Sequence, residues 1–292
     1  MWTRRMLATG VISVTAVLAL AANLPADASE APSSDEPAAA APAGWNLAWS
    51  DEFTGSSGTS PNDANWVFDT GGEPQWGNQE WQYYTDRPEN VSLDGAGNLA
   101  ITARKEQLPG MAGCPYGSCD ITSGRITSKG KFAQAYGRLE ASIKVPKGQG
   151  MWPAFWMMGA NIDEVNWPEC GEIDIMETVG KTPNQVEGTA HATGFPEAGI
   201  GGATTVSAPL ADAFHTFAVE WKPASVTWFV DTTAYFTISK SELASGQQWP
   251  FDQPFYLLLN LAVGGEMPGS PDASTPFPST MLVNYVRAYT QA

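Results

Sequence analysis

Residues 136–145 read Tyr-Gly-Arg-Leu-Glu-Ala-Ser-Ile-Lys-Val, and their alternation of apolar and polar side chains decides the fold class. In a β-strand, successive side chains point to opposite faces of the sheet. Leu139, Ala141, Ile143 and Val145 therefore share one face, and the polar residues between them share the other. This period of two predicts a strand with one apolar face packed in a core.

Short segments of the same kind recur along the chain, separated by Gly, Pro, Asn and Asp. Further strands are predicted at Leu99–Ala103, Phe214–Trp221, Val226–Val230, Phe255–Ala262 and Val283–Tyr289. The chain also contains 29 Gly and 22 Pro, which favour turns over long helices. Together these features predict an all-β protein, an antiparallel β-sandwich.

Residues 1–28 have the three parts of a secretory signal peptide. Arg4 and Arg5 form a basic start, Met6–Ala22 is apolar, and Ala26-Asp27-Ala28 offers small residues for cleavage. The alternative is a membrane anchor, but the apolar run is short for a span of about 20 residues and has no basic flank after it. We therefore expect export and cleavage. General secretion and the twin-arginine route both stay open.

Two further regions follow the predicted leader. Residues 29–43 are rich in Ala, Pro, Ser and acidic residues, so they bury little apolar surface and are predicted to form a disordered linker. Residues 44–292 then form one domain, since all-β sandwiches of this size are commonly single domains. We expect a secreted, extracellular monomer with no membrane contact after cleavage.

The chain is acidic, with a formal net charge of −16, and loss of residues 1–28 makes it one unit more negative. This charge is a poor match to nucleic acid or to an anionic membrane, so we expect neither as a partner. The 12 Trp, 8 Tyr and 12 Phe suit a neutral polymer that binds by stacking on rings. Solubility outside the cell explains the acidity equally well.

Three carboxylates lie close together in residues 171–177, which read Gly-Glu-Ile-Asp-Ile-Met-Glu. In a plain strand, Glu172 and Asp174 share a face, and Glu177 is out of phase by one residue. A β-bulge at Ile175-Met176 would absorb the extra residue and return Glu177 to that face. We therefore predict a bulged strand with three acids on one side.

Three acids on one face are costly unless they are solvated or serve a reaction. Repulsion between like charges raises the pKa of at least one carboxyl group. Hydrolysis of a glycosidic bond uses such a pair, one carboxylate as nucleophile and one protonated carboxyl as acid. The alternatives are a solvated acidic face, which would not need the flanking apolar residues, and a calcium site, which draws oxygens from several loop positions.

The segment Glu172–Glu177 resembles the signature of glycoside hydrolase family 16, in the bulged form Glu-x-Asp-x-x-Glu that is typical of laminarinase-like members. Other segments also resemble the family: Trp49–Phe53, Gly77–Thr85, Ser123–Arg125, Gly150–Trp156 and Leu259–Gly265. The resemblance runs from Trp45 to Tyr289.

The resemblance implies a β-jelly roll with a concave substrate cleft. It implies endo-acting, retaining hydrolysis of β-1,3-glucans of the laminarin type, with no cofactor in catalysis. Glu172 matches the nucleophile, Glu177 the acid/base and Asp174 an assisting carboxylate. Mixed-linkage glucan and algal galactan are alternative substrates. A non-catalytic glucan-binding protein on the same fold is the alternative function, which the presence of all three acids disfavours.

The resemblance also places six residues in the cleft: Asn78, Glu80, Arg125, Trp152, Trp156 and His191. The two tryptophans are four residues apart, so they share a strand face and would stack on sugar rings. Asn78, Glu80 and Arg125 would bind sugar hydroxyls. For each of the six, core packing or local hydrogen bonding is the alternative.

A structural calcium site is a further implication of the resemblance. Many relatives use an Asp in a motif similar to residues 283–287, which here read Val-Asn-Tyr-Val-Arg. Asn284 keeps a carbonyl oxygen and lacks the charge, while backbone oxygens near Glu52 and Gly95 would be the other ligands. We therefore expect at most a weak dependence on calcium.

The chain has three cysteines. Cys114 and Cys119 are separated by four residues in a loop-like stretch. In an exported protein this spacing predicts a local disulfide, with two free thiols as the alternative. Cys170 is left over. We expect it to be buried and structural, because a cysteine nucleophile needs a base partner and both histidines are far away in the sequence.

Overall fold

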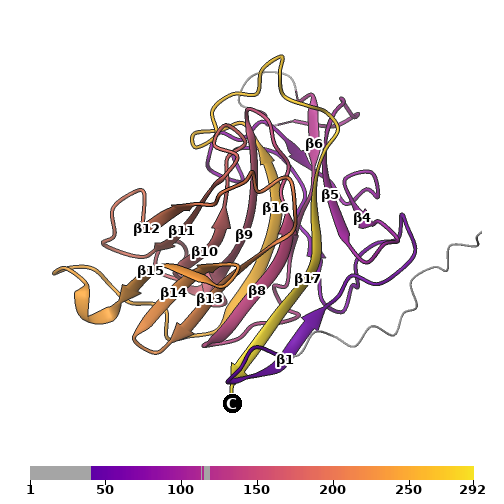
Figure 1. The fold of residues 1–292 in the computed structure, drawn as a ribbon. Coiled ribbons are helices and arrows are strands. Elements are labelled where there is room, and N and C mark those ends of the chain that lie inside the picture. The colour runs from indigo at the N-terminus through magenta and orange to yellow at the C-terminus, as the bar shows by residue number, and fades with distance from the viewer. Residues whose placement is uncertain (1–40, 113, 115–118) are drawn as a thin grey trace, which may run out of the picture. The chain divides into compact units, whose positions relative to one another are not determined.

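The computed structural model describes residues 41–112, 114 and 119–292, so the predicted leader and most of the predicted linker lie outside the described residues. Within this part of the chain, two β-sheets stack face to face (Figure 1). Helical structure is limited to α1 (Ile162–Val165) and a 3-10 turn at Lys240–Glu242. No helix in the described part is long and apolar enough to span a bilayer.

The larger sheet, called sheet A, has ten strands: β1 (Trp45–Asp51), β3 (Tyr83–Tyr84), β4 (Val91–Leu93), β5 (Leu99–Lys105), β6 (Ile121–Ser123), β8 (Gly137–Lys144), β13 (His215–Lys222), β14 (Ser225–Val230), β15 (Thr233–Ser239) and β17 (Ser279–Gln291). The smaller sheet, called sheet B, has seven: β2 (Val67–Phe68), β7 (Arg125–Thr127), β9 (Met151–Gly159), β10 (Glu172–Glu177), β11 (Gln185–His191), β12 (Ile200–Thr205) and β16 (Phe255–Val263).

The strand order shows how distant parts of the chain meet. Sheet A runs β15-β14-β13-β8-β17-β5-β6-β3, with β1 paired to β17 and β4 paired to β5. Sheet B runs β12-β11-β10-β9-β16-β7-β2. Every strand pair is antiparallel except β3 with β6. The predicted all-β, antiparallel sandwich is confirmed, and all six predicted strands are present.

The core fills the space between the two sheets. Leu139, Ala141 and Ile143 of β8 are fully buried there, as their alternation predicts. The polar face of β8 is also buried, because β8 lies between β13 and β17. On that face Arg138 donates to Glu140 at 2.7 Å, and the Tyr289 hydroxyl donates to the other oxygen of Glu140 at 3.0 Å. Pairing of this kind offsets the cost of burying the charges.

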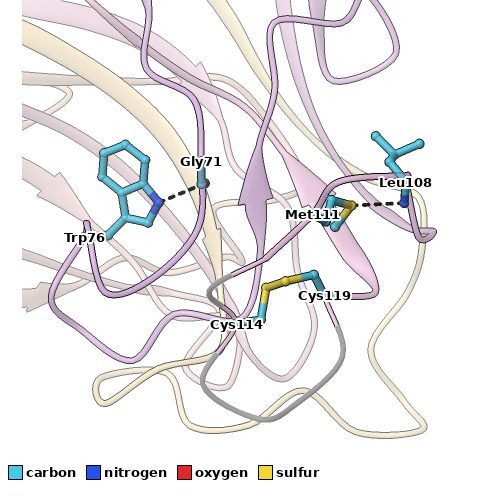
Figure 2. Close-up of a disulfide and its surroundings, with 6 residues drawn as sticks. All are labelled: Gly71, Trp76, Leu108, Met111, Cys114 and Cys119. Atoms are coloured by element: carbon cyan, nitrogen blue, oxygen red, sulfur yellow. Dashed lines mark hydrogen bonds between the residues drawn. A yellow bond between two sulfur atoms is a disulfide. The ribbon is translucent and has the colours of Figure 1, made fainter.

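The loop between β5 and β6 carries a disulfide between Cys114 and Cys119, with the two sulfur atoms 2.05 Å apart (Figure 2). Cys170 is a free, buried thiol whose sulfur lies 3.5 Å from that of Met158. Burial raises the pKa of the Cys170 thiol to about 11. A thiol with so high a pKa is a poor nucleophile near neutral pH.

Candidate active site

Strand β10 brings the three acids of the motif to one face of sheet B. Ile173, Ile175 and Met176 are fully buried in the core between the sheets. The carboxylate-bearing residues of β10 therefore face the opposite way, onto the outer face of sheet B. We call this face, from β11 to β7, the catalytic face.

The expected bulge is present in the pairing of β10 with both of its neighbours. Against β9, Asp174 pairs with Trp156 and Met176 with Phe155, so Ile175 is one residue too many. Against β11, the register also shifts between Asp174 and Glu177. The bulge lets two consecutive apolar residues enter the core and turns Glu177 back to the catalytic face.

Glu172 begins β10 and is partly buried. Its Oε2 accepts a hydrogen bond of 2.8 Å from the indole N–H of Trp167, which lies in the loop before the strand. Across the sheet, Glu172 is opposite Met158 of β9 and His191 of β11. The Trp167 indole therefore fixes one oxygen of the Glu172 carboxyl group.

Glu177 ends β10 and is held in a similar way. Its Oε1 accepts a hydrogen bond of 2.9 Å from the indole N–H of Trp152 in β9. Glu187 of β11 is its partner in the register on the other side. The second oxygen of Glu177 is left to carry or accept a proton.

Asp174 lies between the two glutamates and is almost completely buried, with 4% of its surface exposed. Its Oδ2 has no hydrogen-bond partner among the described residues and lies 3.3 Å from Nε2 of His191. Its backbone carbonyl accepts a bond of 2.7 Å from the indole N–H of Trp228, which reaches across the core from β14. Trp228 thus ties the bulged strand to sheet A.

Burial raises the pKa of all three carboxyl groups, and each also feels another negative charge. Beyond burial, Asp174 raises the pKa of Glu172, Glu177 raises the pKa of Asp174, and Glu172 raises the pKa of Glu177. The cluster therefore retains protons at a pH where isolated carboxyl groups have lost them. A carboxylate and a protonated carboxyl can coexist here, as acid-assisted displacement requires.

Arg125 of β7 lies farther along the catalytic face, between two indole rings. Its guanidinium carbon is 4.6 Å from the ring centroid of Trp76 and 4.9 Å from that of Trp156. Its Nε donates to Asp69 at 2.9 Å. The face thus combines flat aromatic surfaces with a fixed cation, which suits a neutral sugar chain with many hydroxyls.

A chain of buried hydrogen bonds supports Trp156 from below. The indole N–H of Trp156 donates to Asn260 Oδ1 at 2.8 Å, and Asn260 donates to the Tyr84 hydroxyl at 3.2 Å. Tyr84 in turn donates to Glu80 at 3.2 Å. These bonds fix the orientation of the Trp156 ring, which is partly exposed.

Two residues predicted to contact sugar lie deeper than expected. Glu80 is 4% exposed, and its carboxylate accepts bonds from Asn78, Gln82 and Tyr84, which is the local hydrogen bonding named as the alternative to sugar contact. Trp152 is 9% exposed, and its N–H is used by Glu177. The Glu80 carboxylate and the Trp152 N–H can be buried at little cost, because each has a hydrogen-bond partner inside the protein.

The remaining predicted residues lie on or near the catalytic face. Asn78 is exposed and is held by Glu73, whose carboxylate accepts the backbone N–H groups of Gly77, Asn78 and Glu80. His191 is partly buried beside Asp174. Their contact with a sugar stays a prediction.

Asn260 was not among the predicted site residues, whereas Trp167 is a loop aromatic that the sequence allows either to line the cleft or to pack on the surface. Asn260 is the one polar residue in the apolar strand Phe255–Val263, and a lone amide in a buried strand signals a specific hydrogen-bond partner. The bond from Trp167 to Glu172 could not be predicted, because it depends on the path of a loop.

The predicted calcium position carries hydrogen-bond donors. Nδ2 of Asn284 donates to the carbonyl of Gly97 at 3.0 Å and to the side-chain oxygen of Asn98 at 3.2 Å. The Glu52 carboxylate pairs with Arg287 through two bonds of 2.9 and 2.7 Å. The side chains of Asn284 and Glu52 therefore already have partners inside the protein, and the expectation of at most a weak dependence on calcium stays a prediction.

A second group has donor atoms of the kinds that bind metals. Glu172, Asp174 and His191 place oxygen and nitrogen atoms within 4.8 Å of one another. One Glu172 oxygen already accepts the Trp167 N–H, and the raised pKa values favour protons on the carboxyl groups. We assign this group to proton chemistry.

A bulged strand with two indole-held glutamates, on the outer face of an antiparallel β-sandwich, defines a glycoside hydrolase. Comparison with known proteins gives the family. Residues 77–286 match the model of glycosyl hydrolases family 16. The chain belongs to this family.

Relatives share most of the described domain. The chain is 41% identical over 259 residues to a beta-glucanase of Rhodothermus marinus, covering 84% of this chain and 85% of the other. It is 35% identical over 281 residues to glucan endo-1,3-beta-glucosidase A1 of Niallia circulans, covering 85% of this chain and 38% of that longer protein. The laminarinase catalytic domain of Thermotoga maritima has 45% identity and a TM-score of 0.78, covering 85% of this chain and 99% of its own.

Proposed function

We propose that this chain hydrolyses internal β-1,3-glucosidic linkages of laminarin-type glucans and retains the anomeric configuration. The bulge in β10 carries the proposal, because it places Glu172 and Glu177 on one face with an indole N–H fixing each carboxyl group. Family membership and the names of the relatives support the substrate class.

The proposed mechanism has two steps. Glu172 attacks the anomeric carbon, and the bond from that carbon to the glycosidic oxygen breaks while Glu177 donates its proton to that oxygen. Water then attacks the resulting glycosyl ester, and Glu177 takes a proton from the water as the ester bond to Glu172 breaks. Asp174 lies between them, where its charge or its proton adjusts the balance between the two glutamates.

A glucan-binding protein without catalysis would use the same aromatic surfaces. It would not need three clustered carboxyl groups with raised pKa values, since removing them from water costs stability without aiding binding. Catalysis explains why the protein keeps these carboxyl groups despite their cost in stability.

The test is incubation with laminarin, lichenan, agarose and carrageenan, followed by sizing of the products. We expect laminarin to be cut first into oligosaccharides, with an early fall in chain length. Release of glucose alone from chain ends would rule out internal cleavage. Faster cleavage of lichenan or of a galactan would change the substrate and keep the enzyme class.

We also propose that the protein works outside the cell as a monomer. The signal-like residues 1–28 support export, and the acidic composition supports solubility there. N-terminal sequencing of the protein from the culture medium, with gel filtration at several concentrations, tests both points. An uncleaved N-terminus in the cell pellet would contradict export.

A further inference from the structure

The outer face of sheet A has a cavity that the proposed reaction does not use. Its volume is about 470 Å³, within the ~300–1,000 Å³ range of small-molecule sites. Four neighbouring strands, β14, β13, β8 and β17, supply most of its walls (Figure 1). Its lining includes Arg138, Glu140, Thr216, Glu220, Phe229 and Tyr285.

The alternation of side chains along β8 places this cavity away from the catalytic face. Leu139 and Ala141 are buried in the core between the sheets, so Arg138 and Glu140 point outward from sheet A. The three acids of β10 point outward from sheet B. A ligand in the cavity therefore lies outside the catalytic cleft, with both sheets between the two sites.

A buried ion-pair network forms the floor of the cavity. Arg138 donates to Glu140 at 2.7 Å and to Glu220 at 3.3 Å. Arg138 is 8% exposed and Glu140 is 4% exposed. The other oxygen of Glu140 accepts a hydrogen bond of 3.0 Å from the Tyr289 hydroxyl. Because each charged group is fixed by a partner, the cavity has a rigid polar floor.

Two partly exposed aromatic rings, those of Phe229 and Tyr285, also line the cavity. The guanidinium carbon of Arg138 is 5.4 Å from the ring centroid of Phe229, and that of Arg287 is 3.8 Å from the ring centroid of Tyr285. The Tyr285 hydroxyl is 3.3 Å from the hydroxyl of Thr216. Aromatic rings beside a few fixed polar groups suit a sugar, which has apolar C–H faces and hydroxyls at its edge.

The charges around the cavity favour a neutral ligand. One arginine and three carboxylates line it, so the net negative charge opposes an anionic ligand. Glu140 and Glu220 are paired with Arg138, and Asp231 contacts His215 at 2.9 Å. All three carboxylates already have partners, so a cation would have to displace them. A neutral ligand with many hydroxyls fits both conditions.

We propose that this cavity is a second binding site for the glucan that the enzyme cuts, and that it takes a glucosyl unit from another part of the polymer. In a glucan gel, chains surround the protein on all sides. A site on the outer face of sheet A can therefore hold the enzyme in the polymer while the cleft cuts it. The inference rests on the proposed function for the identity of the glucan and adds a site with no part in bond cleavage.

Affinity electrophoresis in native gels that contain increasing amounts of laminarin measures this binding. The Glu172→Gln variant is the background, so that the polymer is not cut. In this background, Phe229→Ala removes one ring, and Glu220→Gln removes a charge with little change in shape. We expect the dissociation constant for laminarin to rise about tenfold with Phe229→Ala, because loss of one of two linked contacts with a polymer removes their avidity. Glu220→Gln should raise it less.

Phe214→Ala in the same background is the matched control. Phe214 comes directly before β13, is 40% exposed and is not among the residues that line the cavity. Its dissociation constant should equal that of Glu172→Gln alone. Thermal unfolding checks that each variant is folded, and Glu220→Gln keeps the test valid if Phe229→Ala does not fold.

The outcomes separate the inference from the function it rests on. If the parent cuts laminarin but the Phe229 and Glu220 variants bind it as tightly as Phe214→Ala does, the second site is overturned and the proposed function stands. If the parent does not cut laminarin, the proposed function ends, and laminarin binding that depends on Phe229 still supports the second site. Retardation by carrageenan that depends on Phe229 and exceeds that by laminarin overturns the assignment of a neutral ligand.

Discussion

Replacing Trp228 by Phe tests how the core holds the catalytic bulge. The indole of Trp228 is fully buried, and its N–H donates to the carbonyl of Asp174 at 2.7 Å. Phe keeps an apolar ring there but removes the donor and leaves a space. An unpaired buried carbonyl costs about 1–3 kcal/mol, and the smaller side chain adds about 1–2 kcal/mol.

We expect the free energy of unfolding of Trp228→Phe to fall by about 2–4 kcal/mol, measured by urea titration at constant m-value. The Asp174 carbonyl lies inside the bulge, so a shift there also moves the carboxyl groups on either side. For the folded fraction, we expect kcat on laminarin to fall about 10- to 100-fold, because small misplacements of reacting groups are costly.

Trp221→Phe is the control for this experiment. Trp221 is 1% exposed, and its N–H donates at 2.9 Å to the carbonyl of Phe251, a residue outside β10. It should lose a similar amount of stability and keep its kcat. If the two variants lose kcat equally when compared at equal folded fraction, Trp228 has no special link to the catalytic strand and the reasoning is refuted.

Three further predictions concern charge and metal. Glu172→Gln should abolish turnover and raise the free energy of unfolding at pH 8 by about 1–2 kcal/mol, because the pKa of Glu172 is raised in the folded state and the parent loses stability as the pH rises above the ordinary carboxyl range. In thermal unfolding, this added stability should shrink toward pH 4. Added stability that persists at pH 4 would contradict the reasoning. Glu177→Gln should lose most activity on laminarin and much less on a glucoside with an activated aryl leaving group, which departs without a proton; equal losses on both would remove Glu177 from the acid role. A chelator should change the melting temperature little, since Asn284 lacks the charge of an Asp and its amide is engaged with Gly97 and Asn98. A large fall that calcium reverses would show a bound ion.

Much of the fold could be predicted from local patterns. Alternation in residues 136–145 predicted β8, and the phase of Glu177 relative to Glu172 predicted the bulge, because both follow from the two-residue repeat of a strand. The buried polar face of β8 could not be predicted, since Glu140 finds Tyr289 only when distant strands pair.

The contacts that support the site residues could not be predicted from the sequence for the same reason. Trp156 and Asn260 are 104 residues apart in sequence, and their bond exists only because β9 and β16 are neighbours in sheet B. The burial of Glu80 and the reach of Trp167 also depend on loop paths that no short-range repeat encodes. Motif resemblance predicted the reacting groups, and the tertiary structure shows which side chains hold them in place.

The place of β17 in sheet A has a consequence for the synthesis of the protein. This strand pairs with β1, β5 and β8, so it joins three strands that leave the ribosome well before it does (Figure 1). Until Ser279–Gln291 emerges, those strands have open edges and the sandwich cannot close. We therefore expect the sandwich to close late in synthesis, after Ser279–Gln291 has been made.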